Sequence, residues 1–395
     1  MSGTVSEAVI VDVIRTPSGR GKPGGALSSI HPVDLAAGVL SAVLERNGLE
    51  SRQIDDVLLG CVSQVGDQAM NVARQAVLAA GFDEHVPATT IDRQCGSSQQ
   101  AVHFAAQGVM AGAYDIVIAG GVESMSRVPL GTSVRGGGIA DGIRTRYPDG
   151  LVSQGVSAEL IAQRWSLSRE QLDEYSARSH ARAAHAADSG WFDSQIVSVP
   201  TESGIVTRDE TIRAATTAER LAQLEPAFRD DALAARFPDL DWRITAGSSS
   251  PLTDGASAAL IMSAARAEQL GLTPRARFRG FAVVGDDPLM MLTGPIPATE
   301  RVLERAGLRI EDIDAYEVNE AFASVPLAWA ADVGADPERM NPWGGAIALG
   351  HALGSSGTRL LGTLLAHLEA TGGRLGLQTM CEGGGMANAT VIERI

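Results

Sequence analysis

The sequence predicts an α/β protein made of two duplicated halves with an inserted loop domain. Of the 395 residues, 45% are hydrophobic and 20% charged, and 44 are glycine, a composition typical of a compact α/β enzyme. The run ERNGLESRQIDDV at 45–57 recurs as ERAGLRIEDIDAY at 304–316, and GSS at 96–98 recurs at 354–356. A helical stretch and an apolar strand follow each GSS. In both cases the two copies are separated by nearly the same number of residues, which indicates a duplicated unit of alternating strands and helices.

The two copies are separated by a stretch of different character, roughly 124–243. It holds glycine-rich turns, a long helical run from 168 to 190 and connections rich in Arg, Asp and Thr, which is the composition of a loop domain over one end of a core. We therefore expect an N-terminal half at 1–272, containing this insertion at about 124–243, and a C-terminal half at 273–395.

The bulk properties exclude several classes of partner. A net charge of −15 argues against nucleic acid or a membrane surface. The most apolar window, AVHFAAQGVMAGAYDIVIAGGV, is interrupted by polar residues and glycines, so we expect no membrane span. The N-terminal run MSGTVSEAVIVDVIRTP carries an acid early and leads into a strand, so we expect no signal peptide and a cytoplasmic location.

The rare residue types narrow the chemistry. Lys22 is the only lysine and Pro23 follows it, so neither a phosphate-binding Lys-Ser/Thr loop nor Schiff-base chemistry is indicated. Three cysteines are too few for a disulfide framework and lack the spacing of metal ligands, so we expect no metal. Cys61 belongs to no motif and is interpreted as a packing residue.

Cys95 stands out in the stretch TTIDRQCGSSQQ at 89–100. The preceding residues resemble the end of a buried strand, and the residues from Ala101 onward have the apolar spacing of a helix. A thiol at a helix N-terminus feels the positive end of the helix dipole, which favours the thiolate. The alternative is a small buried hydrophobe, the usual fate of a free cysteine.

Three further segments place reactive side chains at predicted strand ends or tight turns, where α/β folds gather ligands and catalytic groups. They are YEVNEAFAS with Asn319, NPWGGAIALGHALGSSGTR with His351 and TMCEGGGMAN with Cys381. Because Cys95 and His351 flank the two GSS echoes, pseudo-twofold packing would bring them together. A histidine beside a thiol can remove its proton and leave a nucleophile.

These segments resemble the signatures of the thiolase family, from RTP at 15–17 to the C-terminal ATVIERI, so the resemblance covers nearly the whole chain. It implies a layered core of two αβα halves and acyl transfer between a thioester and coenzyme A. Cys95 matches the nucleophile that becomes acylated, His351 the base that activates it, and Cys381 the acid/base at the α-carbon of acetyl-CoA. We expect coenzyme A and acyl-CoA as substrates, with no permanently bound cofactor, and a homodimer or homotetramer.

Two oxyanions develop in such a reaction and each needs preorganised donors. By resemblance, Asn319 (through a water) and His351 serve the enolate oxygen. The backbone N–H groups of Cys95 and Gly383 serve the tetrahedral intermediate. The glycines after Cys381 suit that role, since close backbone approach favours residues without side chains.

Binding of coenzyme A, a polyanion, requires local positive charge on this acidic chain. Arg213 matches a nucleotide contact of the family, whereas Arg220 replaces a residue that is usually not basic. Ser250 matches a serine near the pantetheine, and Phe322 of NEAF lines the same channel in relatives. For each arginine, a solvated surface position is the alternative.

The chain departs from the biosynthetic acetoacetyl-CoA pattern at several positions. Gln154 stands where that subgroup carries a methionine that narrows the acyl pocket, which predicts room for a longer or bulkier acyl group. Pro251, Ala352 and Trp343 also depart from the pattern, and the stretch 229–243 is longer than in typical relatives. These differences remove no catalytic group, so they bear on which substrate is used and not on which reaction is catalysed.

Other functions remain open at this point. Decarboxylating condensing enzymes share the fold but lack the second cysteine. Gly19, Gly21 and Gly24 satisfy a dinucleotide-binding pattern, yet Pro23 stands where its helix should open. A biosynthetic acetoacetyl-CoA-forming enzyme and a catalytically silent acyl-CoA-binding scaffold are the remaining alternatives. Because the carbon–carbon condensation is unfavourable, a degradative thiolase is the preferred interpretation.

Overall fold

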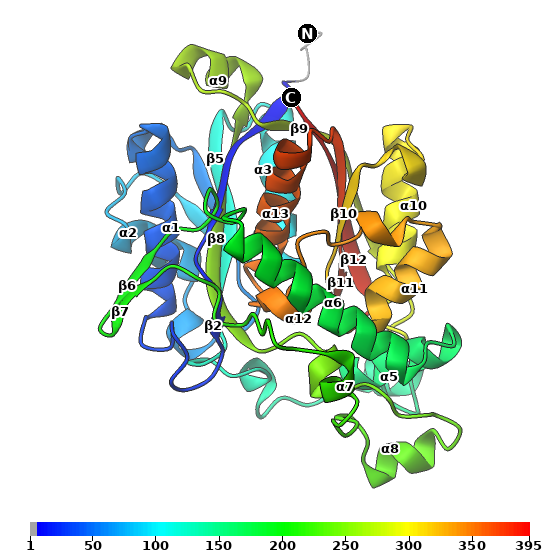
Figure 1. The fold of residues 1–395 in the computed structure, drawn as a ribbon. Coiled ribbons are helices and arrows are strands. Elements are labelled where there is room, and N and C mark those ends of the chain that lie inside the picture. Colours follow the sequence, from blue (N-terminus) through cyan, green and yellow to red (C-terminus); the bar gives the residue numbers. More distant parts are fainter. Residues whose placement is uncertain (1–5) are drawn as a thin grey trace.

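A computed structural model describes residues 6–395, and the first five residues of the N-terminal run, with that part of the signal-peptide expectation, lie outside it. The chain builds layers of helices and strands, with α3 and α13 in the middle (Figure 1). The predicted α/β class and layered αβα core are confirmed. No helix within 6–395 is both long and apolar enough to cross a membrane.

Ten strands form one mixed sheet in the order β10-β11-β12-β9-β1-β8-β5-β3-β4, with β2 paired to β8. The strands are β1 (Ala8–Arg15), β2 (Gly19–Arg20), β3 (Asp56–Gly60), β4 (Ala88–Ile91), β5 (Ile116–Ser124), β8 (Thr253–Ser263), β9 (Ala276–Gly285), β10 (Ala315–Val318), β11 (Leu375–Glu382) and β12 (Met386–Arg394). Only two residue pairs, Val9 with Arg277 and Ile10 with Ala276, join β1 to β9. The sheet therefore narrows where its two halves meet.

The sequence echoes occupy equivalent places in the two halves. α1 (Pro32–Asn47) and α10 (Pro295–Ala306) each end at a left-handed glycine, Gly48 and Gly307, with φ of 61° and 66°. A short 3₁₀ turn then leads into β3 in one half and β10 in the other. Each GSS is followed by a helix, α3 (Ser97–Met110) or α13 (Ser356–Thr371). The repeated letters thus encode a repeated helix, turn and strand.

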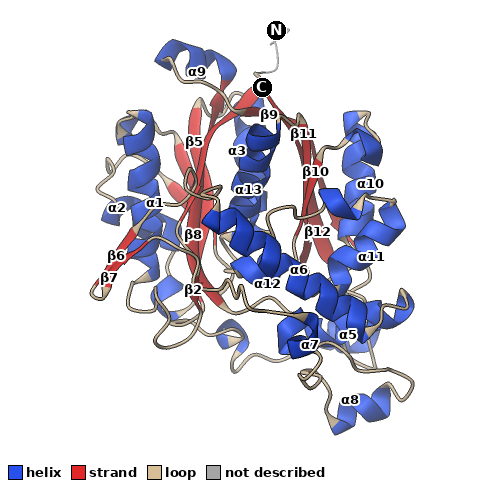
Figure 2. Cartoon of the chain, in the orientation of Figure 1, coloured by secondary structure: helices blue, strands red, loops and turns tan. Residues whose placement is uncertain are grey.

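Three apolar cores hold the layers together. The middle core packs α3 and α13 against both parts of the sheet, through residues such as Ala105, Val109, Leu361 and Leu365. α1 and α2 (Val72–Ala79) cover the outer face of the first half. α10 and α11 (Ser324–Val333) cover the outer face of the second (Figure 2). Cys61 is fully buried in the first outer core, in keeping with a packing residue.

The stretch 124–243 crosses one end of these layers and carries its own helices and a small two-stranded ribbon (Figure 1). They are α4 (Asp141–Arg146), α5 (Gln154–Arg164), α6 (Arg169–Asp188), the β6–β7 ribbon (Val199–Thr201 and Gly204–Val206), α7 (Ala218–Leu221) and α8 (Asp231–Arg236). α5 packs on α11, and α6 packs on α12 (Ala346–Leu349). α9 (Ala264–Leu270) follows β8, and 3₁₀ turns lie at Ser51–Gln53, Gly66–Gln68, Thr132–Val134, Ala246–Ser248, Ile310–Asp312 and Pro337–Arg339.

Candidate active site

Cys95 lies in the tight connection between β4 and α3, as the sequence predicts. Gln94 adopts a left-handed backbone with φ of 49°, an uncommon conformation for a residue with a side chain. The Asp92 carboxylate holds it by accepting the Gln94 N–H at 2.7 Å, and the Ser97 hydroxyl donates to the Gln94 carbonyl at 2.6 Å. Gly96 is the N-cap of α3. The buried thiol therefore sits on a fixed turn directly before a helix N-terminus.

Opposing influences act on the thiol of Cys95. Burial, followed by the charge of Glu382, raises its pKa to about 12, although hydrogen bonds from its own N–H, from Gly383 N–H and from the Gln154 side chain act to lower it. Burial and the neighbouring charges of Cys95 and Glu382 also raise the pKa of Cys381, at the end of β11, well above its ordinary value. Both cysteines are therefore neutral thiols in the free protein, and a negative charge on Cys95 opposes ionisation of Cys381.

The two GSS turns meet face to face at the centre of the molecule. The backbone N–H of Thr358 donates to the Ser98 hydroxyl at 3.0 Å. A Cβ on Gly357 would lie 2.3 Å from the Gln99 nitrogen, so only glycine permits this approach. The buried Glu123 carboxylate accepts the N–H of Gly354 at 2.9 Å and anchors the second turn to β5. Pseudo-twofold packing therefore brings together the N-termini of α3 and α13.

The hydrogen bonds of His351 assign its tautomer. Its Nδ1 lies 2.7 Å from the Ser356 hydroxyl, and that hydroxyl donates its single proton to the Ala352 carbonyl at 2.8 Å. The hydroxyl therefore accepts from Nδ1–H, which leaves Nε2 unprotonated. Burial, reinforced by the charge of Arg359, lowers the pKa of His351 to about 3. The imidazole is thus a neutral base with a free Nε2.

Asn319 follows β10 and lies between the reactive groups. Its side-chain nitrogen is 3.5 Å from Nε2 of His351. Its backbone N–H donates to the carbonyl of Thr379, two residues before Cys381, at 3.0 Å. The adjacent Glu320 is fully buried. Its carboxylate accepts from Tyr175 Oη (2.9 Å), Ser179 Oγ (2.7 Å), Asn341 Nδ2 (3.0 Å) and Ile347 N (3.1 Å). Glu320 therefore ties α6 of the insertion to the segment that leads into His351.

Glu382 is a site residue that sequence reasoning missed. It follows Cys381, is fully buried, and its Oε1 would lie 1.9 Å from a Cβ on Gly96, so the carboxyl rests against the turn after Cys95. The Asn388 amide, in its hydrogen-bonded orientation, donates to Oε1 at 3.1 Å. Burial raises the pKa of Glu382 to about 9, although the charge of Arg93 opposes this. A neutral carboxylic acid therefore lies under the cysteine at neutral pH. The sequence signal that could have found it is the acid in C-E-GGG. Successive side chains of a strand point to opposite faces, so β11 directs Glu382 to the face opposite Cys381.

Of the residues expected to contact coenzyme A, Arg213 lines a narrow cleft. The cleft is lined by His180, Arg213, Thr216, Leu221, Ala246, Gly247, Ser249, Pro251 and Ile347. Ser250 lies between two of these residues and its N–H donates to the Ala321 carbonyl at 3.0 Å. Phe322 is buried, bridges to Ser249 and meets the ring of Phe228 edge-on at 5.6 Å.

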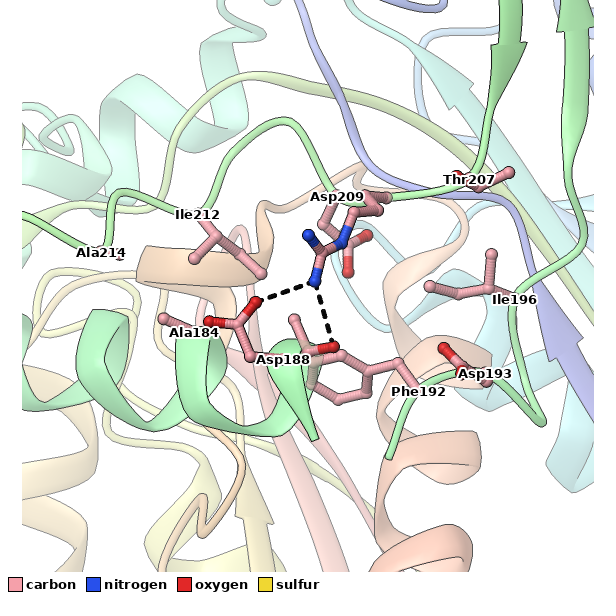
Figure 3. A pocket seen from close by; sticks show the side chains of 11 residues that line it. Ala184, Asp188, Phe192, Asp193, Ile196, Thr207, Asp209, Ile212 and Ala214 are labelled. Carbon is pink, nitrogen blue, oxygen red and sulfur yellow. Dashed lines mark hydrogen bonds and ion pairs between the residues drawn. The ribbon is translucent and has the colours of Figure 1, made fainter. Parts of the chain in front are cut away.

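Arg220 is the predicted contact that the described structure does not place on this cleft. Its guanidinium donates to the Ala215 carbonyl at 3.0 Å within its own loop, and its backbone N–H meets the Thr217 cap. A wider cavity lies between the end of α6 and residues 207–214 (Figure 3). There Arg208 pairs with Asp188 at 2.8 Å, and Asp209 holds the buried Arg15. None of the predicted site residues lines that cavity in the described part of the chain.

The site lies where the paired helices α3 and α13 of the duplicated core begin. It combines two buried thiols, a neutral histidine with an unprotonated Nε2 and a positioned amide. These groups are what a cysteine-dependent acyltransferase requires. Nothing in residues 6–395 groups three or more His, Cys, Asp or Glu side chains around a common metal position.

The family models for the N-terminal and C-terminal domains of thiolase match residues 8–265 and 272–394. The chain belongs to the thiolase family and is an acyltransferase. It is 46% identical over 400 residues to the steroid 3-ketoacyl-CoA thiolase FadA6 of Mycobacterium tuberculosis, covering 99% of this chain and 95% of that one. It is 44% identical to the 3-ketoacyl-CoA thiolase of Marinobacter nauticus over the full length of both. The crystal structure of the Bacillus anthracis acetyl-CoA acetyltransferase superimposes with a TM-score of 0.88 at 38% identity, covering all of both chains.

Proposed function

We propose that this protein cleaves 3-ketoacyl-CoA with coenzyme A to acetyl-CoA and a shortened acyl-CoA, through an acyl group carried on Cys95. The observation that carries the proposal is that the turns after Cys95 and His351 meet through the hydrogen bond from Thr358 N–H to the Ser98 hydroxyl. Cys381 is close enough to Cys95 for the two to interact electrostatically, and Asn319 lies 3.5 Å from Nε2 of His351. Relatives at 44–46% identity are named 3-ketoacyl-CoA thiolases, and these names support the thiolytic direction of the reaction.

In the first half-reaction, Nε2 of His351 takes the proton of Cys95 while the sulfur attacks the 3-keto carbon. Because the thiol pKa is about 12 and the imidazole pKa about 3, the pair is neutral at rest, and we expect proton transfer to accompany attack. The N–H groups of Cys95 and Gly383 serve the oxyanion. Collapse breaks the bond between Cα and Cβ, and Cys381 gives its proton to the α-carbon of the departing acetyl-CoA enolate, whose oxygen faces Asn319 and His351.

In the second half-reaction, the thiol of incoming coenzyme A gives its proton to the Cys381 thiolate left by the first half-reaction and attacks the acyl-cysteine carbonyl. The Cys95–acyl bond breaks, the acyl group leaves as acyl-CoA, and His351 returns its proton to the sulfur of Cys95, so both cysteines are thiols again. Arg213, with Ser250 and Phe322 near the cleft, contacts the nucleotide and pantetheine parts of coenzyme A, which is a substrate and does not stay bound. Arg220, whose guanidinium donates to the Ala215 carbonyl, is a further predicted contact of the same molecule.

The acyl group is larger than acetyl in this proposal, because Gln154 replaces the methionine that narrows the pocket of the biosynthetic subgroup. The second candidate is an acetoacetyl-CoA-forming acetyltransferase, favoured by the similarity to the Bacillus anthracis structure. A ranking of kcat/KM for thiolysis of acetoacetyl-CoA, 3-ketohexanoyl-CoA, 3-ketopalmitoyl-CoA and a steroid 3-ketoacyl-CoA decides between them. Preference for a longer or bulkier acyl group supports the proposal, and a preference for acetoacetyl-CoA supports the second candidate.

Failure to turn over any of these thioesters, in folded protein that binds coenzyme A, would leave the silent acyl-CoA-binding scaffold. We also expect a homodimer or homotetramer in the cytoplasm, and sedimentation equilibrium of the purified chain tests the first of these expectations.

A further inference from the structure

The hydrogen bonds of the buried Glu320 carboxylate come from two separate parts of the chain. The hydroxyls of Tyr175 and Ser179, one turn apart on α6, donate to its two oxygens at 2.9 and 2.7 Å. From the other side, the Asn341 amide and the Ile347 N–H donate at 3.0 and 3.1 Å. All four donors are neutral, so the stability of this buried charge depends on each of the four hydrogen bonds.

The carboxylate is also fixed by close packing. A Cβ on Gly345 would lie 2.2 Å from the carboxyl carbon of Glu320, so only glycine permits this approach. The N–H of Gly345 donates to the Ser179 hydroxyl at 3.1 Å, and the Asn341 amide donates to the Tyr175 hydroxyl at 3.1 Å. The donors are therefore bonded to one another as well as to Glu320, and the network joins α6 to the loop before α12.

Asn319 depends on this network because its own side chain has few supports. Its side-chain oxygen is buried and has no hydrogen-bond partner within residues 6–395, and its side-chain nitrogen is 3.5 Å from Nε2 of His351, which is long for a hydrogen bond. Its backbone is held at Thr379 on one side and is followed directly by Glu320 on the other. His351 has separate supports, because its backbone N–H donates to the Thr253 hydroxyl at 2.9 Å and its Nδ1 is bonded as described above.

We propose that Glu320 is a positioning residue that sets the place of the Asn319 amide beside His351. Tyr175 and Ser179 share this role, because they hold the carboxylate from the insertion. The inference rests on the proposed function, in which Asn319 and His351 serve the enolate oxygen of the departing acetyl-CoA. Groups that stabilise a developing charge must be held to within about 0.5 Å of the productive geometry. The insertion thus supports cleavage of the carbon–carbon bond through α6.

Two reactions of Cys95 separate this role from a purely structural one. Acylation by acetoacetyl-CoA breaks the bond between Cα and Cβ and releases the enolate of acetyl-CoA. Acylation by acetyl-CoA forms no enolate: the Cys95 sulfur attacks the thioester carbon, the bond from that carbon to the sulfur of coenzyme A breaks, and coenzyme A leaves as a thiol with the proton taken from Cys95. Exchange of labelled coenzyme A into acetyl-CoA measures this second reaction. Only the first reaction needs donors to an enolate oxygen.

The variants remove one part of the network at a time. Tyr175→Phe deletes one donor from α6 and keeps the ring. Tyr316→Phe is the matched control, because Tyr316 is also buried and its hydroxyl donates to the Ile310 carbonyl at 2.9 Å, outside the network. Glu320→Gln is the stronger change, since it puts an N–H₂ group among the donors. Thermal melting checks that each variant is folded, and Tyr175→Phe decides the question if Glu320→Gln does not fold.

We expect Tyr175→Phe to slow acylation by acetoacetyl-CoA about tenfold and Glu320→Gln about 10²-fold in stopped-flow experiments, with the exchange reaction within about twofold of the wild type. Tyr316→Phe should match the wild type in both reactions, although it also loses a buried hydrogen bond. Equal slowing of both reactions, the same slowing in Tyr316→Phe, or no slowing in the folded Tyr175→Phe would overturn the proposal and leave Glu320 as a structural residue.

Failure of the proposed function gives a different result. In that case acetoacetyl-CoA leaves no acyl group on Cys95 of the folded wild type, and the role of Glu320 falls with the reaction that it serves. A wild type that is acylated, beside folded variants that are acylated at the same rate, overturns the role of Glu320 alone.

Discussion

The buried carboxyl of Glu382, which lies against the turn after Cys95, makes the free energy of unfolding depend on pH in a defined direction. The pKa of Glu382 is raised from 4.5 to about 9 in the folded chain, so between these values the folded state holds a proton that the unfolded state has released. Stability therefore falls as pH rises through this window. At about 1.4 kcal/mol per unit, the cost at pH 7 is about 3 kcal/mol, and it levels off near 6 kcal/mol above pH 9.

Gln at this position keeps the shape of the side chain and has no proton to lose. We therefore expect Glu382→Gln to gain stability over the wild type as pH rises, with a small difference at pH 5 and a gain of about 3 kcal/mol at pH 7. Urea unfolding at half-unit steps from pH 5 to pH 9, followed by tryptophan fluorescence, measures the difference. The other buried acids titrate equally in both proteins and cancel.

The matched control is Glu174→Gln, since Glu174 is an exposed glutamate on α6, and the Glu382→Gln difference is compared with it at each pH. A stability difference for Glu382→Gln that is constant from pH 5 to pH 9 would refute the reasoning, because it would mean that Glu382 is already ionised at pH 5. The same ionisation opposes the thiolate of Cys95, so the variant should also keep its activity to higher pH than the wild type.

Three further predictions concern the site directly. Ser356→Ala removes the acceptor that fixes the tautomer of His351, so kcat should fall about tenfold with little change in the KM for coenzyme A, as initial rates will show. Arg213→Ala should raise that KM several-fold, and the gap from wild type should shrink with added salt in the same rate assay. Gly383→Ala places a methyl 2.9 Å from Oε1 of Gln94 and disturbs the turn that carries a donor, so acylation in a stopped-flow experiment should slow by about 10²-fold while the melting temperature changes little. An unchanged KM for Arg213→Ala, an unchanged kcat for Ser356→Ala or an unchanged acylation rate for Gly383→Ala would contradict the role given to that residue.

Much of the fold could be predicted because the chain repeats itself. The echoes at 45–57 and 304–316 turn out to be the same helix end, glycine turn and strand start, and each GSS begins a helix of the middle layer. The cysteine turn could be predicted because an apolar strand, a small polar connection and a helical spacing follow one another in a dozen residues.

The missing parts depend on contacts between segments far apart in the chain. Glu382 carries no sign in the sequence that its carboxyl lies beneath Gly96, more than 280 residues away, because only the pairing of the two halves creates that contact. For Arg220, charge and position predict a ligand contact. The structure shows that its backbone N–H bonds to the Thr217 cap of α7 and that its guanidinium donates to the Ala215 carbonyl, so the contact stays a prediction.

The central claim is that Cys95 carries the acyl group in a thiolytic reaction. The most direct measurement is the intact mass of the protein after brief exposure to acetoacetyl-CoA, with Cys95→Ser beside it and peptide mapping to locate the adduct. We expect one acetyl group on Cys95 of the wild type, none on Cys95→Ser, and removal of the acetyl group when coenzyme A is added. An adduct on Cys381, or no adduct in folded protein that binds coenzyme A and is exposed to a full range of 3-ketoacyl-CoA substrates, would contradict it.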